Sequence, residues 1–240
     1  MKNMELTFIK DMFDTIAPRY DLLNRLLSFR QDVYWRRAMV SEIKIPDNGT
    51  ALDVACGTGD VAFEIIRQKN SNATVVGIDF SPRMLSVCKS KAIKDYTKRA
   101  KTTANIHLVA GDALYLPFKA ETFDVITIAF GIRNICDRLA VLKIFHNCLK
   151  TKGQLLVLEL ATPPKGLPLL FYLFYSKKIL PLIGWFFSRN IKAYEYLPSS
   201  VASFPAPDAF AATIRSAGFK NIRHKALTIG AATLYVGNKA

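Results

Sequence analysis

The sequence has few of the residue types that bind metal ions. Its 240 residues include three histidines and four cysteines, and no two cysteines form a C-x-x-C pair. Because the histidines are scattered without metal-ligand spacing, we predict that the protein holds no metal ion. No apolar segment follows the first residues, Met1 to Glu5, so a secretory signal peptide is not expected. These absences predict reduced thiols and a cytoplasmic location.

Acidic residues are also scarce, with 19 Asp and Glu against 33 Lys and Arg, and the formal net charge is +14. A basic surface favours nucleic acid or anionic lipid as a neighbour, although a solvated helix face gives the same composition. The densest basic run, Lys89 to Lys101, contains one aromatic residue, Tyr96. Sites for single-stranded RNA interleave aromatic and basic residues, so we expect no nucleic-acid partner.

Long uninterrupted apolar runs are absent, although one segment comes close. Leu167 to Phe187 is nearly as long as a membrane span, but Lys177, Lys178 and two prolines fall inside it. Charges near the centre of a bilayer are costly, so we predict two short helices instead of a span. Its aromatic residues and flanking cations suit either a lid packed over a sheet or peripheral contact with an anionic membrane.

The most informative stretch that is present is residues 51–60, Ala-Leu-Asp-Val-Ala-Cys-Gly-Thr-Gly-Asp. Its first half is a short apolar run, which predicts a buried parallel strand. Cys56 to Gly59 predicts a tight turn, where glycine tolerates positive φ and lets a ligand approach the backbone. Asp60 is placed to cap the helix that follows, which has apolar residues at helical spacing. Strand, turn and helix together predict a nucleotide-binding βα unit.

Three acidic residues are associated with the predicted strands. Asp53 lies inside the first strand, four residues before Gly57. Asp79 ends the second strand, 22 residues after Gly57, and this spacing is typical of an acid that binds ribose hydroxyls. Asp112 follows the third strand. The glycine spacing also fits the dinucleotide pattern G-x-G-x-x-G/A, so the glycines alone do not distinguish between cofactors.

Strands that alternate with helices indicate a parallel sheet. The expected strands are residues 51–55, 74–79, 106–110, 123–129 and 154–160, followed by 222–227 and 232–236. The expected helices are three before residue 46, then one from residue 60, one over 81–91, one over 138–150 and one over 207–217. Pro18 separates the first two helices, and Asp32 is expected to cap the third.

Ligands of parallel sheets bind beyond the carboxyl ends of the strands, so the residues that follow the strands are expected to converge. These residues are Gly57–Gly59, Asp79, Asp112 and Phe130–Asn134.

Several motifs resemble one enzyme family. Asp53-x-x-x-Gly57-x-Gly59, Asp79 and Asp112 are similar to the class I S-adenosylmethionine-dependent methyltransferases. Nearly the whole chain resembles the ubiquinone/menaquinone biosynthesis C-methyltransferases within that class. The motifs that carry this resemblance are Phe13-Asp-x-Ile-Ala-x-x-Tyr20-Asp21-x-x-Asn24, Trp35-Arg36-Arg37, Cys56-Gly-Thr-Gly-Asp60, Phe130-Gly-Ile-Arg-Asn134 and Tyr194-x-Tyr196-Leu197-x-x-Ser200.

The resemblance implies a single α/β domain with a Rossmann-like, mostly parallel sheet of seven strands, the last strand antiparallel and helices on both faces. Residues 1–48 are expected to form a helical cap, 49–160 the cofactor-binding core, 161–205 a helical lid, and 206–240 the last helix and strands. The implied reaction is methyl transfer from S-adenosylmethionine to a ring carbon of a polyprenylated quinol. Demethylmenaquinol is the first expected acceptor, and the benzoquinol of ubiquinone synthesis is the second.

The resemblance, taken with the strand ends, also assigns roles to residues. The expected cofactor-binding residues are Asp53, Gly57, Thr58, Gly59, Asp79, Asp112, Ala113 and Ala129. Ala129 stands where many members have serine, so a hydroxyl expected near the cofactor is absent. The expected acceptor-binding residues are Phe130, Tyr194 and Tyr196. Arg133 is expected to stabilise a developing phenolate, and Asn134 to hold a hydroxyl or a water.

Three other classes of protein are left open. An RNA or protein N-methyltransferase would explain the charge, but such enzymes often carry Asn/Asp-Pro-Pro-Tyr after the fourth strand, where this chain has Ala129-Phe-Gly-Ile. A methyltransferase acting on another small molecule is a further alternative. An NAD-dependent oxidoreductase would share the glycine pattern, although Asp53 and Asp112 favour S-adenosylmethionine. A membrane-binding module without enzymatic activity would leave the convergent residues unexplained. A homo-oligomer is compatible with each class.

Overall fold

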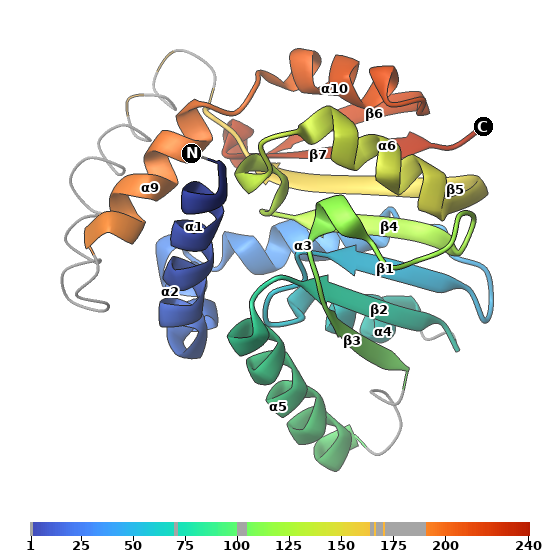
Figure 1. Ribbon diagram of the computed structural model, residues 1–240, viewed down its shortest axis with the longest axis horizontal. Helices are drawn as coiled ribbons and strands as arrows, with labels where there is room; N and C mark the ends of the chain where they lie inside the picture. The colour runs from blue at the N-terminus through green and yellow to red at the C-terminus, as the bar shows by residue number, and fades with distance from the viewer. Residues whose placement is uncertain (1, 70–71, 100–104, 164–165, 167–169, 171–190) are drawn as a thin grey trace.

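The computed structural model describes residues 2–69, 72–99, 105–163, 166, 170 and 191–240. Seven strands form one sheet in the order β3-β2-β1-β4-β5-β7-β6 (Figure 1). The strands are β1 (Thr50–Val54), β2 (Thr74–Asp79), β3 (Ile106–Ala110), β4 (Phe123–Ala129), β5 (Leu149–Leu160), β6 (Lys220–Leu227) and β7 (Ala232–Asn238). Neighbours from β3 to β5 pair in parallel, and β7 is antiparallel to both β5 and β6. The expected seven-stranded sheet with an antiparallel last strand is confirmed.

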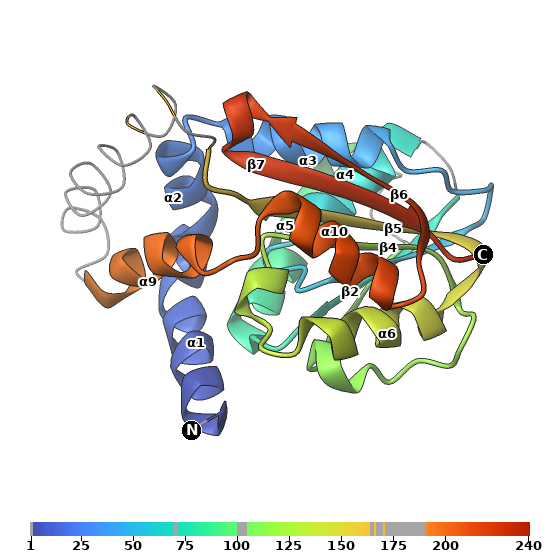
Figure 2. The same cartoon turned by 90° about the horizontal axis from the view of Figure 1, so that it is seen from above.

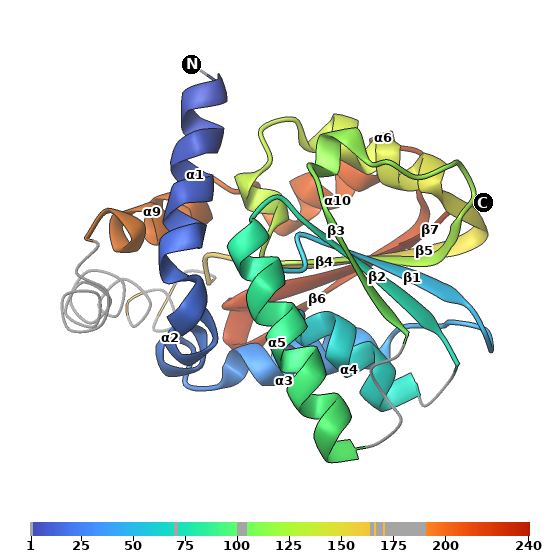
Figure 3. The same cartoon turned by 60° about the horizontal axis from the view of Figure 1, so that its bottom comes forward.

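Helices cover both faces of the sheet. The described helices are α1 (Lys2–Ile16), α2 (Tyr20–Leu27), α3 (Gln31–Ser41), α4 (Asp60–Lys69), α5 (Pro82–Arg99), α6 (Arg138–Cys148), α9 (Ile191–Ala202) and α10 (Pro207–Ser216). Short 3-10 turns are η1 (Ala17–Arg19), η2 (Ala113–Tyr115), η3 (Ile132–Asn134) and η5 (Thr228–Gly230). Helices α3, α4 and α5 lie on one face, and α6 and α10 on the other (Figure 3). Helices α1, α2 and α9 stand together at one end of the sheet (Figure 2).

Each face of the sheet has its own hydrophobic core. On one face, the predicted apolar side of α4 (Val61, Ala62, Ile65 and Ile66) packs with Trp35 and Met39 of α3. On the other face, Phe145 of α6 and Phe210 of α10 pack against β4, β5 and β7. Burial of apolar surface on both faces therefore stabilises the sheet and holds the carboxyl ends of its strands in place.

Two of the expected helix caps are wrong. Helix α3 begins at Gln31 after Arg30, and Asp32 lies inside the helix, where it is buried and paired with Arg36 at 2.6 Å. Asp60 is the first residue of α4, and its carboxylate pairs with Lys91 at 2.6 Å instead of capping the helix. In both cases a cation offers a stronger partner than a backbone amide. The expected cap at Ser81 is confirmed by a bond from the Met84 amide at 3.1 Å.

Other boundaries differ from the prediction. Strand β5 begins at Leu149, because residues 149–153 continue the strand and Leu149 pairs with Phe123. Helix α5 continues to Arg99, eight residues beyond the predicted end. The two helices expected within Leu167–Phe187 lie outside the described residues, apart from Leu170. Among the described residues, no helix combines the length and apolar character needed to cross a membrane.

Candidate active site

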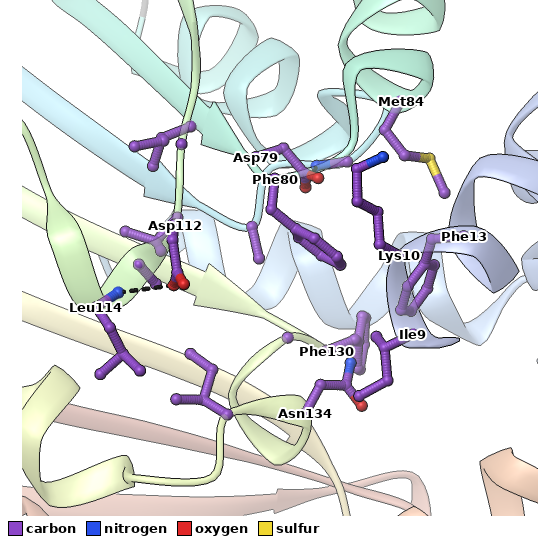
Figure 4. A pocket seen from close by; sticks show the side chains of 18 of the residues that line it. Ile9, Lys10, Phe13, Asp79, Phe80, Met84, Asp112, Leu114, Phe130 and Asn134 are labelled. Atoms are coloured by element: carbon purple, nitrogen blue, oxygen red, sulfur yellow. Dashed lines mark hydrogen bonds between the residues drawn. The ribbon is translucent and has the colours of Figure 1, made fainter. Parts of the chain in front are cut away.

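A cavity of about 300 Å³ opens at the carboxyl ends of β1, β2, β3 and β4, and we call it the sheet-edge cavity (Figure 4). The predicted site residues that line it are Gly57, Asp79, Asp112, Ala113, Ala129, Phe130 and Asn134. Helix α1 adds Ile9, Lys10 and Phe13, and the first residue of α2 adds Tyr20. The strand ends therefore converge as the sequence predicted, and the N-terminal helices close one side of the cavity.

Backbone amides hold the two acids that the sequence predicted for this cavity in place. Asp79 accepts hydrogen bonds from the amides of Gly57, at 2.8 Å, and Ser81, at 2.9 Å. Burial raises the pKa of Asp79 above its ordinary value. Asp112 accepts from the amide of Leu114 at 2.9 Å and so begins η2 (Figure 4). Because each carboxylate oxygen has two lone pairs, both acids keep acceptor capacity for a ligand.

The two glycines of the turn have different surroundings. Both have positive φ, 54° at Gly57 and 84° at Gly59. A Cβ added at Gly57 would lie 4.0 Å from its nearest neighbour, a ring atom of Tyr20, whereas one at Gly59 would meet Cys88 Sγ. Gly57 therefore leaves open space beside the sheet-edge cavity, where a ligand can approach the backbone. Gly59 instead allows α5 to pack against the turn.

Asp53 and Thr58 lie outside the lining of the sheet-edge cavity. Asp53 is 1% exposed, and one of its oxygens accepts from the Thr127 hydroxyl at 2.9 Å. Its other oxygen has no hydrogen-bond partner among the described residues, and burial raises the pKa of Asp53 to about 7. Thr58 donates to Asp21 of α2 at 2.5 Å. Both residues thus lie behind the turn, and no three metal-binding side chains group together in the part of the chain described.

A second cavity, of about 330 Å³, lies beside the first, and we call it the helical cavity. Its apolar lining comes from distant parts of the chain and includes Leu27, Phe29, Trp35, Leu160, Leu197, Val201 and Ile229. Tyr20 and Phe130 line both cavities. A ligand in the helical cavity would therefore be separated from one in the sheet-edge cavity only by the space around these two rings.

Arg133 and Asn134 are neighbours in η3 but line different cavities. Arg133 lines the helical cavity and Asn134 lines the sheet-edge cavity. The Arg133 guanidinium donates to Glu159 and to the Phe130 carbonyl, both at 2.6 Å. Glu159 is fully buried, and Arg133 Nε has no partner within the described residues. The guanidinium is therefore fixed in position while one of its donors is left unused.

Asn134 is in turn held by one of the predicted tyrosines. Its Oδ1 atom accepts a hydrogen bond from the Tyr196 hydroxyl at 2.9 Å, although Tyr196 lines neither cavity. Tyr194 falls in α9, and its side chain is outside what the structure describes. Tyr196 therefore supports the site through Asn134, and the expected contact of Tyr194 with the acceptor stays a prediction.

Sequence reasoning gave no role to Tyr20, Trp35 or Arg36. Tyr20 stands between the two cavities, and its burial raises the pKa of the phenol. Arg36 lies over the Phe130 ring at 5.1 Å, and Trp35 packs beside the same ring at 6.0 Å. All three residues occur in the motifs that carry the family resemblance, and these motifs could have indicated a functional role from the sequence alone.

Comparisons with known proteins agree with this geometry. A sequence model of the ubiE/COQ5 methyltransferase family matches residues 1–239. The chain is 48% identical to the ubiquinone/menaquinone biosynthesis C-methyltransferase UbiE of Geotalea daltonii, over 96% of each protein. It is 43% identical to the demethylmenaquinone methyltransferase of Thermus thermophilus, over 95% of this chain and all of that protein.

Solved structures show the same fold at low sequence identity. A structure described as a SAM-dependent methyltransferase from Thermotoga maritima superposes with a TM-score of 0.66 at 18% identity. The match covers 96% of this chain and 99% of that chain. The expected family resemblance and Rossmann-like fold are therefore confirmed, and the chain belongs to the ubiE/COQ5 methyltransferase family.

Proposed function

We propose that this chain transfers the methyl group of S-adenosylmethionine to a ring carbon of a polyprenylated quinol, first of all demethylmenaquinol. The observation that carries the proposal is the pair of cavities that meet at Tyr20 and Phe130. Both cavities have a mostly apolar lining, and the first also has anchored acids with spare acceptor capacity beside a glycine turn. The activities for which the relatives are named, C-methylation in ubiquinone/menaquinone biosynthesis and demethylmenaquinone methylation, support the same reaction.

The sheet-edge cavity fits the cofactor. Asp79 would accept from the ribose hydroxyls, and Asp112 would lie near the adenine amino group. The open side of Gly57 and the small side chains of Ala113 and Ala129 leave room for it. Asp53, Thr58 and Gly59 support this site from behind by holding the turn against β4, α2 and α5.

The helical cavity suits the acceptor. Bound S-adenosylmethionine supplies an electrophilic sulfonium methyl group, so the residues of the chain need to make the quinol ring carbon nucleophilic and align it. A quinol that loses a phenolic proton places negative charge on its oxygen and on the adjacent ring carbon. Arg133 would stabilise that phenolate with its fixed guanidinium, and Asn134 would hold a hydroxyl or a water on the other side. The rings of Trp35 and Phe130 give the quinol an apolar surface on which to stack.

The substrate also determines where the enzyme works. A polyprenyl tail keeps a quinol in the bilayer, so the enzyme reaches its acceptor as a peripheral protein on the cytoplasmic face of an anionic membrane. The net charge of +14 is suited to such contact.

A direct experiment uses purified protein, methyl-labelled S-adenosylmethionine and two short-chain acceptors, a naphthoquinol and a benzoquinol. Mass analysis and carbon NMR locate the label. The expected result is label on a ring carbon of the naphthoquinol. Transfer to neither acceptor, or only to an oxygen, would overturn the proposal, and tight binding of NAD would support the oxidoreductase alternative.

A further inference from the structure

Large apolar side chains gather on the outer side of α2 and next to it. Of the nine large hydrophobic residues that are exposed among those described, four fall between residues 22 and 34, namely Leu22, Leu26, Phe29 and Tyr34. Leu22 and Leu26 are one helical turn apart, so they share one side of α2. A fifth, Ile229 in η5, is 74% exposed. We call these five residues the α2 face.

Hydrogen bonds join the two parts of the α2 face. The Trp35 indole donates to the Thr228 hydroxyl at 2.7 Å, and that hydroxyl donates to Gln31 at 2.9 Å. The loop that carries Ile229 is therefore fixed beside the start of α3. Phe29 and Ile229 also line the helical cavity, so the α2 face borders the opening of that cavity.

The charges around the α2 face have one sign. From residue 17 to residue 41, the charged residues that are exposed are Arg19, Arg30 and Arg37, of which Arg37 also lies 3.9 Å from Glu64 of α4. Both acids of this stretch are paired with cations, Asp21 with Lys91 at 2.8 Å and the buried Asp32 with Arg36 at 2.6 Å. Exposed apolar side chains among arginines are typical of a surface that binds anionic lipid. Contact with water alone does not account for the apolar side chains.

The backbone is strained at the same place. Thr228 and Ile229 have φ of 45° and 56°, and Phe29 and Arg30 have φ of 49° and 63°. β-Branched residues are disfavoured in this left-handed region, where asparagine or glycine fits at lower cost. The fold therefore exposes the Ile229 side chain to solvent at an energetic cost, which indicates that this side chain has a functional role.

We propose that the α2 face docks on an anionic lipid bilayer and turns the opening of the helical cavity toward the membrane. The apolar side chains would enter the boundary between headgroups and acyl chains, and the arginines would meet lipid phosphates. The proposal rests on the proposed function only in naming the quinol that passes from the bilayer into the cavity.

The test uses the full chain and vesicles of phosphatidylcholine, with and without phosphatidylglycerol, in a co-sedimentation assay. Leu22→Gln/Leu26→Gln should weaken binding to anionic vesicles by roughly ten-fold or more, because two insertable side chains are lost. Arg30→Asn should weaken it by roughly five-fold and reduce its dependence on salt. Ile229→Asn should weaken it while keeping the fold, since asparagine tolerates the left-handed backbone.

A matched control removes exposed apolar side chains elsewhere. Ile93→Gln/Leu139→Gln alters residues on α5 and α6, and it should bind vesicles as the parent does. Equal binding by the parent and Leu22→Gln/Leu26→Gln, or an equal loss in the control, would overturn the proposal. Conversion of a dimer to a monomer by Leu22→Gln/Leu26→Gln, with vesicle binding retained, would assign the face to a second copy and also overturn it.

Activity separates this proposal from the proposed function. Leu22 and Leu26 line neither cavity, so Leu22→Gln/Leu26→Gln should methylate a short-chain, water-soluble quinol as the parent does. The same variant should lose at least ten-fold in rate on a long-chain quinol embedded in anionic vesicles, in line with its weaker binding. A parent that binds vesicles through this face but methylates no quinol would overturn the proposed function alone. Equal rates of variant and parent on the embedded quinol would overturn the docking proposal.

Discussion

The two cavities are built in different ways. In the sheet-edge cavity, Asp112 is held by the amide of Leu114, two residues away, and Asp79 is held by the amide of Gly57, in the turn after the neighbouring strand β1. The helical cavity depends on contacts such as that of Trp35 with Thr228, 193 residues apart. The comparison shows that the edge of the sheet supplies the anchored acids of the first cavity, whereas the helical cavity requires segments from the first and last parts of the chain to meet.

The two cavities also use charge differently. Asp79 and Asp112 keep acceptor capacity toward a ligand, whereas the Nη1 atom of Arg133 donates to both buried Glu159 and the Phe130 carbonyl. A buried ion pair is costly to form, so this pair fixes the position of the Arg133 guanidinium more than it stabilises the fold. If the comparison is right, variants of one cavity should alter cofactor binding and variants of the other should alter turnover.

The largest effect is expected at Arg133, which lines only the helical cavity. Arg133→Ala should lower turnover by roughly 100- to 1,000-fold, as removal of an oxyanion-stabilising donor does. Its affinity for S-adenosylmethionine, measured by calorimetry, should stay unchanged. Arg223→Ala, an exposed position on β6, is the control. Retained turnover with reduced thermal stability would show that Arg133 is structural.

The next effect distinguishes the two glycines of the turn. Gly59→Ala should lower the free energy of unfolding by roughly 2–4 kcal/mol, since strain and a clash with Cys88 add together. Gly57→Ala should cost only about 1 kcal/mol, from backbone strain. Its new methyl group would enter the sheet-edge cavity and weaken cofactor binding. Urea denaturation and calorimetry measure both quantities, and equal losses of stability would contradict the distinction.

Asp79→Ala tests the acid of the sheet-edge cavity. Loss of this acceptor should weaken S-adenosylmethionine binding by roughly ten- to a hundred-fold, about 1.5–3 kcal/mol. Asp47→Ala, which removes an exposed acid from a loop, is the matched control. Affinity equal to that of the parent would remove Asp79 from the cofactor site.

Asp53 should give stability a dependence on pH. The folded state raises its pKa to about 7, whereas the unfolded chain has a pKa of about 3.9. Between these values the folded state holds the extra proton, so the free energy of unfolding should fall by about 2 kcal/mol from pH 5 to 6.5. Asp53→Asn should lack this contribution. Identical pH slopes for parent and variant in urea denaturation would show that Asp53 is ionised when folded.

The smallest effect concerns the alanine that departs from the family pattern. Ala129 lines the sheet-edge cavity, and Ala129→Ser would add a hydroxyl there. One added hydrogen bond contributes about 0.5–1.5 kcal/mol, so cofactor affinity should rise by a few-fold. Weaker binding in calorimetry would indicate that the site is shaped around the methyl group.

The sequence predicts the sheet-edge cavity well because its parts are local. Apolar runs locate the strands, and the spacing from Gly57 to Asp79 locates the acid. The predicted helix cap at Asp32 is wrong, because Arg36, one turn further along the helix, binds its carboxylate instead. The sequence also fails to anticipate Tyr20 and Ile229, whose roles arise only when distant segments pack together.

Simultaneous binding of both ligands tests the two-cavity account most directly. Calorimetry would measure the affinity of S-adenosylhomocysteine in the absence and in the presence of a saturating short-chain naphthoquinone. Because the cavities are separate and share only Tyr20 and Phe130, we predict a ternary complex and nearly the same cofactor affinity in both titrations. Mutually exclusive binding would contradict the account, since it would place both ligands in one cavity.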